Sequence, residues 1–522
     1  MRTLIGLGLA ALSVPTVAQV PAKLLINEFR VEGNTVLSTP SIEKAVLPWL
    51  GPDRTQEDIY AARDALAKAY ESAGYLSASV EAERIDPVQT EWGPAWVAVL
   101  KVVEGRVDRL KVSGAEYNLP SKLKAQAAAV NEGEVPHFPS MQEELGRIAR
   151  MADTSVTPLL RPGRDPGTME VELKVQDDLP LHAWTQLSNE QSPDTSARRL
   201  EFGARYDNLF QAQHSLTARV ISTPLKQDEI KVGMLNYSLP VGRRDDKLSL
   251  YVLKSNSLVQ TNIGTGVTGK GLTLGTRWTR TLQAEAPFFH SLSAGVDYKR
   301  LGEDSQDAGS RPVSYLPFTL QYIAMLPDEG GSWQFSSSLV NSFSGLMDKR
   351  GDCGDRKDLD QFDCRRAGAS SGFSFWNSSL KRIERFGRWE VHGRLDWQFA
   401  SGPLLSGDQF FVGGADSVRG YYQSEQGGDD GARAGVELFT PAIELGSWAT
   451  KFLAFYDNGW VRTQQALPGQ APDYRLASYG LGVRSKLGKN LSGQLDFART
   501  SLPGSRSKDG ATRLHAMVRA EF

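Results

Sequence analysis

The sequence predicts a mainly β protein, a 16-stranded antiparallel transmembrane β-barrel preceded by two small α/β modules. From about residue 181 onward, apolar and polar side chains alternate, whereas residues 24–177 contain an α/β pattern that occurs twice. The 522 residues are too many for one core, and 50 glycines beside 11 Trp, 15 Tyr and 21 Phe favour a β-rich chain. No apolar run of about 20 residues follows the N-terminus, which argues against a helical membrane span.

The N-terminus, residues 1–18, has the pattern of a secretory signal peptide. Arg2 supplies a positive charge, a short apolar run extends from Leu4 to Val14, and small residues permit cleavage after Ala18. The alternative is a buried N-terminal helix. Cleavage would place the mature chain beyond the inner membrane.

The first module is predicted over residues 24–104, in the order β-α-α-β-β. The run "INEFRVEGNTV" indicates a strand ending at a Gly-Asn turn, and Thr39-Pro40 indicates a helix start. A second helix begins at Thr55, which forms a capping-box pattern with Asp58. Strands are expected near 77–84 and 96–103.

The second module, residues 105–177, repeats this pattern. The run "VDRLKVSGAEY" resembles "INEFRVEGNTV", with Gly114 in the position of Gly33. A short helix is expected near 120–130 and a second helix from Ser140, followed by strands near 155–160 and 168–175. Each module has an outer strand whose edge could accept an extended peptide.

The barrel is predicted over residues 180–522. In "RWEVHGRLDWQF", residues 388–399, apolar side chains occupy one face and mostly charged or polar ones the other. A half-buried strand of a soluble sandwich is the alternative. Strands of about ten residues with many full charges on the polar face favour a wet lumen and a lipid-facing exterior.

Sixteen strands are expected, and the connections between them alternate between short and long. The expected strands are 181–190, 199–208, 214–223, 228–239, 246–255, 271–282, 289–300, 315–325, 332–343, 372–383, 388–399, 431–441, 450–460, 475–487, 491–500 and 513–522. With short periplasmic turns and long outer loops, Cys353 and Cys364 fall in the fifth outer loop and "VRGY" in the sixth, residues 400–430.

The two cysteines, Cys353 and Cys364, are expected to form a disulfide because an exported chain folds in an oxidising compartment. The nearby Asp352, Asp355 and Asp363 would permit a metal site as the alternative. No histidine accompanies them, and a charged loop explains them equally well.

Motifs in the barrel region resemble those of a known family. "VRGY" comprises Val418, Arg419, Gly420 and Tyr421, "FYDNG" spans residues 455–459, and Phe522 ends the chain. With the two modules, this arrangement resembles the TpsB-type two-partner secretion transporters, or haemolysin activator/secretion proteins, of the Omp85 superfamily. The small modules resemble POTRA domains.

The resemblance implies roles for these motifs. The sixth loop would fold into the lumen, where Arg419 would meet Asp457 of the F-x-D-x-G strand, which also carries Phe455 and Gly459. Arginine suits this role because it offers paired donors to a carboxylate. A solvated Arg419 is the alternative. Many family members also carry a plug helix before the first POTRA domain, and we expect none here.

The function implied is type V protein secretion across the bacterial outer membrane, with the POTRA modules in the periplasm. The cargo would be a large TpsA-type adhesin, cytolysin or toxin. Outer-membrane lipid and the barrel assembly machinery would be further partners of a monomer. We expect no cofactor, and the net charge of −2 gives no general attraction to nucleic acid.

Three other functions are considered. An outer-membrane assembly factor of the same superfamily would carry a longer string of modules, and a diffusion pore would need neither modules nor loop motif. An enzyme is not expected, because the six histidines are scattered and no H-E-x-x-H arrangement occurs. Asp429 and Asp430 are interpreted as solvated loop residues.

Overall fold

The computed structural model divides the chain into two compact units, Met1–Leu179 and Pro180–Phe522. It describes residues 23–522 except 92, 150, 227–228, 243–245, 257–258, 261–266, 269–270, 283–286, 303–311, 348 and 354–355. The expected signal peptide, residues 1–18, lies outside the described residues. No described helix is long and apolar enough to cross a membrane.

The first module contains the predicted elements and one short additional strand. Its elements are β1 (Leu24–Glu32), α1 (Thr39–Val46), η1 (Leu47–Trp49), β2 (Gly51–Arg54), α2 (Gln56–Ser72), β3 (Ala78–Thr90) and β4 (Gly93–Glu104). The sheet order is β2-β1-β4-β3, with β1 parallel to β4. The predicted capping box of Thr55 and Asp58 is present at the start of α2. The strand β2 was not predicted, because four residues containing Gly and Pro carry no strand pattern.

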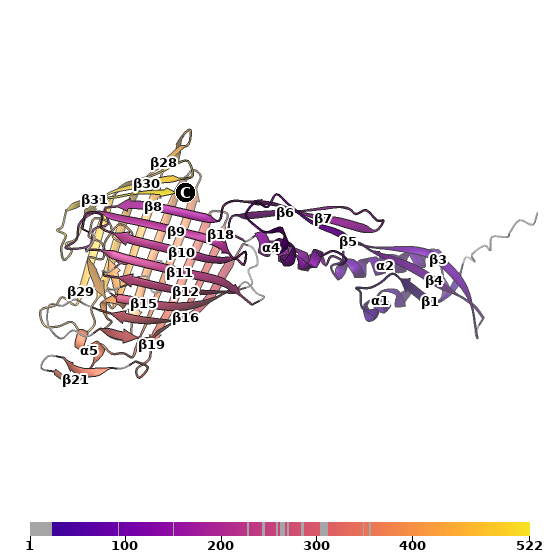
Figure 1. Cartoon of the computed structure of the whole chain (residues 1–522), viewed down its shortest axis with the longest axis horizontal. Coiled ribbons are helices and arrows are strands. Elements are labelled where there is room, and N and C mark those ends of the chain that lie inside the picture. Colours follow the sequence, from indigo (N-terminus) through magenta and orange to yellow (C-terminus); the bar gives the residue numbers. More distant parts are fainter. Residues whose placement is uncertain are drawn as a thin grey trace, which may run out of the picture. The chain divides into compact units, whose positions relative to one another are not determined.

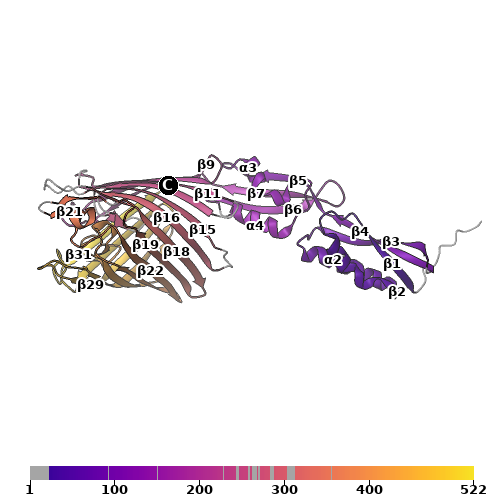
Figure 2. The same cartoon turned by 90° about the horizontal axis from the view of Figure 1, so that it is seen from below.

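The second module repeats the arrangement, and its described residues include no counterpart of β2. It comprises β5 (Arg106–Ser113), α3 (Pro120–Gln126), η2 (Ala128–Val130), α4 (Phe138–Ala149), β6 (Thr154–Pro162) and β7 (Thr168–Asp177), with sheet order β5-β7-β6. Helix α4 begins at Phe138, so the expected start at Ser140 is wrong by two residues. In Figure 2, α2 and α4 each lie against one face of their own sheet. Because each range holds one sheet, we propose 24–104 and 105–177 as the module boundaries.

The repeated glycines end equivalent strands for the same steric reason. Gly33 and Gly114 have φ of +89° and +80°. A Cβ atom would lie 2.2 Å from the carbonyl oxygen of Val102 at Gly33 and 2.4 Å from that of Val175 at Gly114. Only glycine accepts this conformation at such close approach. The sequence repeat is therefore a structural repeat.

A buried carboxylate at the end of the central strand stabilises the turn after each glycine. Glu104 accepts hydrogen bonds from the backbone N–H groups of Thr35 at 2.7 Å and Val36 at 3.1 Å. In the second module, Asp177 accepts three backbone N–H bonds from residues 116–118, at 2.8, 3.0 and 2.8 Å. Burial opposes ionisation of both groups, but these hydrogen bonds, together with those from the side chains of Thr35 and Asn118, outweigh it and hold the pKa of each carboxyl below its ordinary value.

The two modules should therefore lose stability in acid. A lowered pKa means that Glu104 and Asp177 contribute stability above their unfolded pKa values, and this contribution is lost as the pH falls through the folded ones. For segment 23–179, we expect Glu104→Gln and Asp177→Asn to lower the urea midpoint at pH 7. Each variant should also show a weaker pH dependence below about pH 4.5. A pH dependence equal to that of the wild type would contradict the assignment.

The second unit is a closed antiparallel barrel of sixteen strands within the described residues, counting the short segments β17 (Val313–Tyr315) and β27 (Ile443–Leu445) with β18 and β26. The strands are β8 (Leu181–Ser188), β9 (Arg199–Leu209), β10 (His214–Ser222), β11 (Lys231–Val241), β12 (Asp246–Ser255), β15 (Gly271–Thr281), β16 (Phe289–Leu301), β18 (Pro317–Asp328), β19 (Gly331–Ser342), β22 (Phe373–Phe386), β23 (Trp389–Ala400), β26 (Asp430–Phe439), β28 (Trp448–Arg462), β29 (Asp473–Leu487), β30 (Leu491–Thr500) and β31 (Thr512–Glu521). Figure 1 shows β8 to β16 side by side along one wall. The predicted fold class is confirmed.

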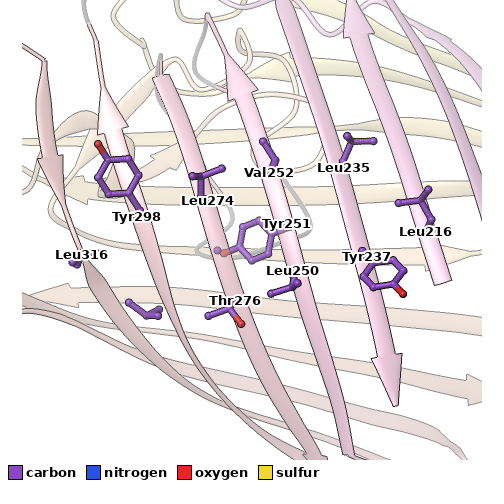
Figure 3. A pocket seen from close by; sticks show the side chains of 12 residues that line it. Leu216, Leu235, Tyr237, Leu250, Tyr251, Val252, Leu274, Thr276, Tyr298 and Leu316 are labelled. Carbon is purple, nitrogen blue, oxygen red and sulfur yellow. The ribbon is translucent and has the colours of Figure 1, made fainter. Parts of the chain in front are cut away.

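The alternation predicted for the barrel separates an apolar exterior from a charged interior. Leu235, Leu250 and Leu274 are exposed on neighbouring strands and border a shallow apolar hollow of about 570 Å³ (Figure 3). On the inner face, Arg277 pairs with Asp297 through hydrogen bonds of 2.7 and 2.8 Å. An uncharged outer face is what contact with lipid acyl chains requires.

The barrel closes where the last strand meets the first. Strands β31 and β8 pair antiparallel from Met517 opposite Ser188 to Glu521 opposite Trp184. The terminal Phe522 extends this ladder, because its N–H donates to Ala183 O at 2.8 Å and its carbonyl accepts from Ala183 N–H at 3.1 Å. The Phe522 side chain is exposed. Its backbone thus takes part in closing the sheet, which leaves no open edge there.

Candidate functional site

Loop 6, residues 401–429, connects β23 to β26 and is largely buried. Its two arms pair as β24 (Phe410–Val412) and β25 (Gln426–Gly428). Between them lie Val418 and Tyr421, both 0% exposed, and Arg419, which is 4% exposed. Arg419 is therefore not a solvated loop charge. A buried guanidinium requires compensating partners.

Arg419 contacts the Asp457 carboxylate in a bidentate manner. Its Nε donates to Oδ2 at 2.7 Å and its Nη2 to Oδ1 at 2.9 Å, while its backbone N–H lies 3.2 Å from Oδ2. Asp457 is 1% exposed. The structure therefore brings together the two residues that the sequence motifs pair, in the geometry that favours arginine over lysine.

Two further acidic side chains and a phenyl ring surround the same guanidinium. Arg419 Nη1 donates to Glu437 Oε1 at 2.7 Å and lies 3.8 Å from Asp496 Oδ1. The guanidinium carbon lies 3.5 Å from the centre of the Phe455 ring. Sequence reasoning missed Glu437 and Asp496, although both occupy inward positions of alternating strands. The cation is thus held by carboxylates from three strands, β26, β28 and β30.

The F-x-D-x-G motif places its three named residues on one face of β28, because side chains two apart point the same way. Phe455 and Asp457 face loop 6, and Gly459 leaves room for it. A Cβ atom at Gly459 would lie 2.9 Å from Val418 Cγ2 and 3.0 Å from Val412 Cγ1. The motif therefore supplies an aromatic face, a carboxylate and a close approach at successive inward positions.

Other wall residues hold the rest of the motif. The Gly420 N–H donates to His515 Nε2 at 2.9 Å. The Tyr421 hydroxyl donates to Leu502 O at 2.6 Å and accepts from Ala477 N–H at 3.2 Å. From β23, Arg394 donates to the carbonyl oxygens of loop residues 416 and 417 at 2.7 and 3.1 Å. Loop 6 is therefore fixed through its backbone as well as through Arg419.

Comparison with known proteins identifies the family. The model of the haemolysin secretion/activation protein ShlB/FhaC/HecB family matches residues 167–485, more than half of the chain. The chain belongs to this family. The ShlB-type POTRA domain matches residues 24–88, within the first module.

Individual relatives are distant. The outer membrane transporter CdiB of Dickeya dadantii (strain 3937) is 25% identical over 114 residues, 22% of this chain and 20% of the relative. CdiB of Escherichia coli O6:K15:H31 (strain 536 / UPEC) is 22% identical over 183 residues, 35% of this chain and 30% of the relative. The chain thus matches less than a third of either relative's length.

Solved structures show the same fold over nearly the whole chain. CdiB from Escherichia coli gives a TM-score of 0.63 at 17% identity, covering 98% of this chain and 93% of that one. CdiB from Acinetobacter baumannii gives 0.56 at 14% identity, covering 97% and 91%. BamA from Haemophilus ducreyi lacking POTRA domains 1–3 gives 0.53 at 12% identity, covering 95% and 100%.

The family is one of TpsB-type outer-membrane transporters in the Omp85 superfamily. This chain is accordingly an outer-membrane β-barrel whose POTRA modules lie in the periplasm. A soluble sandwich is excluded by the closed barrel.

The acidic pair at the end of loop 6, Asp429 and Asp430, is buried. Asp429 and Asp430 are 0% and 1% exposed, so their interpretation as solvated loop residues is wrong. Asp429 accepts hydrogen bonds from Arg366 Nη2 at 2.6 Å and from Leu404 N–H at 2.8 Å. Asp430 accepts from Arg462 Nη2 at 2.6 Å. The two carboxylates fasten the root of loop 6 to its neighbours.

Loop 5, residues 343–372, connects β19 to β22 and contacts the root of loop 6 through Arg366. Cys353 and Cys364 form a disulfide that joins β20 (Arg350–Cys353) to α5 (Gln361–Arg365). Phe362 of α5 is 1% exposed and packs in an apolar cluster with Tyr315 and Leu404. The disulfide therefore cross-links β20 to α5, the helix that ends immediately before Arg366.

Proposed function

We propose that this protein exports a large secreted TpsA-type partner through the barrel, after its POTRA modules have captured the partner in the periplasm. The observation that carries the proposal is loop 6, which lies within a family transporter barrel and is held by Arg419 among three carboxylates. We call this arrangement of Val418–Tyr421 with β28 the latch. A passive pore has no need of such a fastening, whereas a protein-conducting pore must be closed when no cargo is present.

Two strand edges support capture of an extended segment. In the described part of the chain, the outermost strands β3 and β6 each pair with one sheet neighbour, β4 and β7 respectively. Their other backbone edges can bind an unfolded chain by strand addition. This mode recognises an extended backbone, which suits a cargo that folds only after export.

The apolar outer face of the barrel supports a position in the lipid bilayer of the outer membrane. The apolar exterior contacts outer-membrane lipid, and the barrel assembly machinery inserts the chain as a monomer. The sequence contains no G-x-x-x-x-G-K-[ST] loop, so we propose that folding of the cargo outside the cell supplies the driving force. No catalytic step is part of this proposal.

An assembly factor for other outer-membrane proteins is the second candidate. The likeness to BamA, with a TM-score of 0.53 at 12% identity, concerns the fold alone. The family match favours export.

The test is co-production of the full-length chain with a large signal-bearing protein encoded beside it. We expect that protein in the medium, and we expect a form without its N-terminal secretion domain to stay in the periplasm. Retention of the intact cargo inside the cell would overturn export. Loss of unrelated outer-membrane proteins on deleting the chain would favour the assembly factor instead.

A further inference from the structure

A second buried ionic contact holds loop 6, at a point distant from the latch along the barrel wall. Asp408, in η3 (Ser406–Asp408), is 3% exposed. Its Oδ1 accepts from Lys299 Nζ at 2.6 Å, and its Oδ2 accepts from the Tyr315 hydroxyl at 2.5 Å. Lys299 and Tyr315 are 5% and 2% exposed. Both carboxylate oxygens are thus occupied by donors from the wall.

The surrounding contacts fix the backbone of the same segment. Gln398 Nε2 donates to the Asp408 carbonyl at 3.0 Å. Leu404 and Leu405, 1% and 6% exposed, pack in the apolar cluster that contains Tyr315. A buried ion pair in such surroundings fixes position more than it adds stability.

The strand order places the two contacts on well-separated parts of the barrel wall. Counting from β8 around the closed sheet, Lys299 lies on the seventh strand, β16, whereas Asp457 lies on the thirteenth and His515 on the sixteenth. From β16 to β28 is six strands in one direction and ten in the other, and β31, whose His515 also contacts loop 6, lies almost opposite β16 at nine and seven strands. Loop 6 contacts both and must therefore cross the lumen.

We propose that Asp408, Lys299 and Tyr315 form a second anchor, which makes loop 6 a strap fastened to both sides of the lumen, and that this anchor releases during export. This inference rests on the proposed function and names the Asp408 end of loop 6 as the one that moves during export. Arg419 makes four hydrogen bonds to two carboxylates, whereas the Asp408 side chain has one ammonium and one hydroxyl as partners. The Asp408 end is thus the less strongly fastened of the two.

Channel recordings of the full-length protein in planar lipid bilayers test the anchor without any cargo. We expect Lys299→Met and Asp408→Asn to raise the mean conductance at least twofold, and Tyr315→Phe to raise it less. Lys451→Met is the matched control, because it removes a lumen ion pair with Glu390 at 2.8 Å that does not involve loop 6. Conductance of the anchor variants equal to that of Lys451→Met would overturn the proposal.

A charge exchange separates the contact from general damage to the fold. Lys299→Asp and Asp408→Lys should each raise the conductance, and the double variant should return it toward the wild-type value. Failure of the double variant to do so, in barrels that fold as judged by heat-modifiable migration, would count against the contact. If the exchanged variants do not fold, the conductance of Tyr315→Phe tests the anchor instead, because this variant removes the hydroxyl bond to Asp408 without adding a charge.

Export by the same variants tests release. Lys299→Met should secrete cargo at least as fast as the wild type, because the bond that must break is already absent. A folded Lys299→Met barrel that conducts more but secretes less would refute release at this end. If the wild type itself exports no cargo, the proposed function fails, while the conductance results still decide whether the anchor exists.

Discussion

Replacing Arg419 by alanine is expected to reduce cargo secretion at least tenfold while the barrel still inserts into the outer membrane. The substitution removes the one cation that Asp457 and Glu437 bind from loop 6 and leaves Asp457 buried. Breaking a buried ion pair from one side costs about 3–5 kcal/mol, which is enough to weaken the hold of the wall on Val418–Tyr421. Secreted and cell-bound cargo measured together would show the loss.

Two related variants make the result specific to the latch. Arg419→Lys should recover little secretion, because an ammonium cannot bind both Asp457 oxygens as a guanidinium does. Arg277→Ala is the matched control, since it breaks a lumen pair with Asp297 that has no contact with loop 6. It should lower barrel stability and leave secretion near the wild-type level. Normal secretion by Arg419→Ala would remove the latch from the mechanism.

Alternation of polar and apolar residues was sufficient to predict the barrel. A period of two repeated through sixteen segments gives the strand positions to within a few residues, because a register slip would bring lumen charges to the lipid face. Alternation cannot predict short strands such as β2, because its four residues are too few to show a pattern and pair with β1 only through tertiary contact. Long strands can thus be predicted from the local pattern, whereas strands that depend on pairing with a remote segment cannot.

The motifs predicted one contact of the latch and missed its other partners for a topological reason. Arg419 and Asp457 belong to recurring motifs, whereas Glu437, Asp496 and His515 are single inward residues of other strands. Many inward residues are charged, so the sequence cannot show which of them a folded-back loop will reach.

Buried charge in the loops was the hardest feature to predict. Asp429 lies between residues typical of a solvated turn, and its burial arises from three long connections that converge on it. Its partners Arg366, Leu404 and Gln464 are far from it in sequence and lie in loops rather than in strands of fixed register. A carboxylate of this kind is recognised only after the loops have been placed.

Arg366→Ala is expected to destabilise the outer end of the barrel by about 3–5 kcal/mol, because it leaves the fully buried Asp429 without its only cationic partner among the described residues. The arginine also donates to Gln464 O at 3.2 Å and to Leu404 O, so its loss removes hydrogen bonds that join loop 5 to two other connections. The backbone N–H groups that Asp429 still accepts from cannot neutralise its charge. Urea unfolding of the barrel in lipid vesicles measures the effect.

The control lies in the same loop. Arg350→Ala removes a pair with Asp358 whose side chains are 62% and 77% exposed, so it should cost less than about 1 kcal/mol. Adding Asp429→Asn to Arg366→Ala should recover part of the lost stability, because the unpaired charge is then absent. Equal stability of Arg366→Ala and Arg350→Ala would show that Asp429 does not depend on Arg366. The root of loop 6 would then be held by the Asp430–Arg462 pair and by backbone hydrogen bonds.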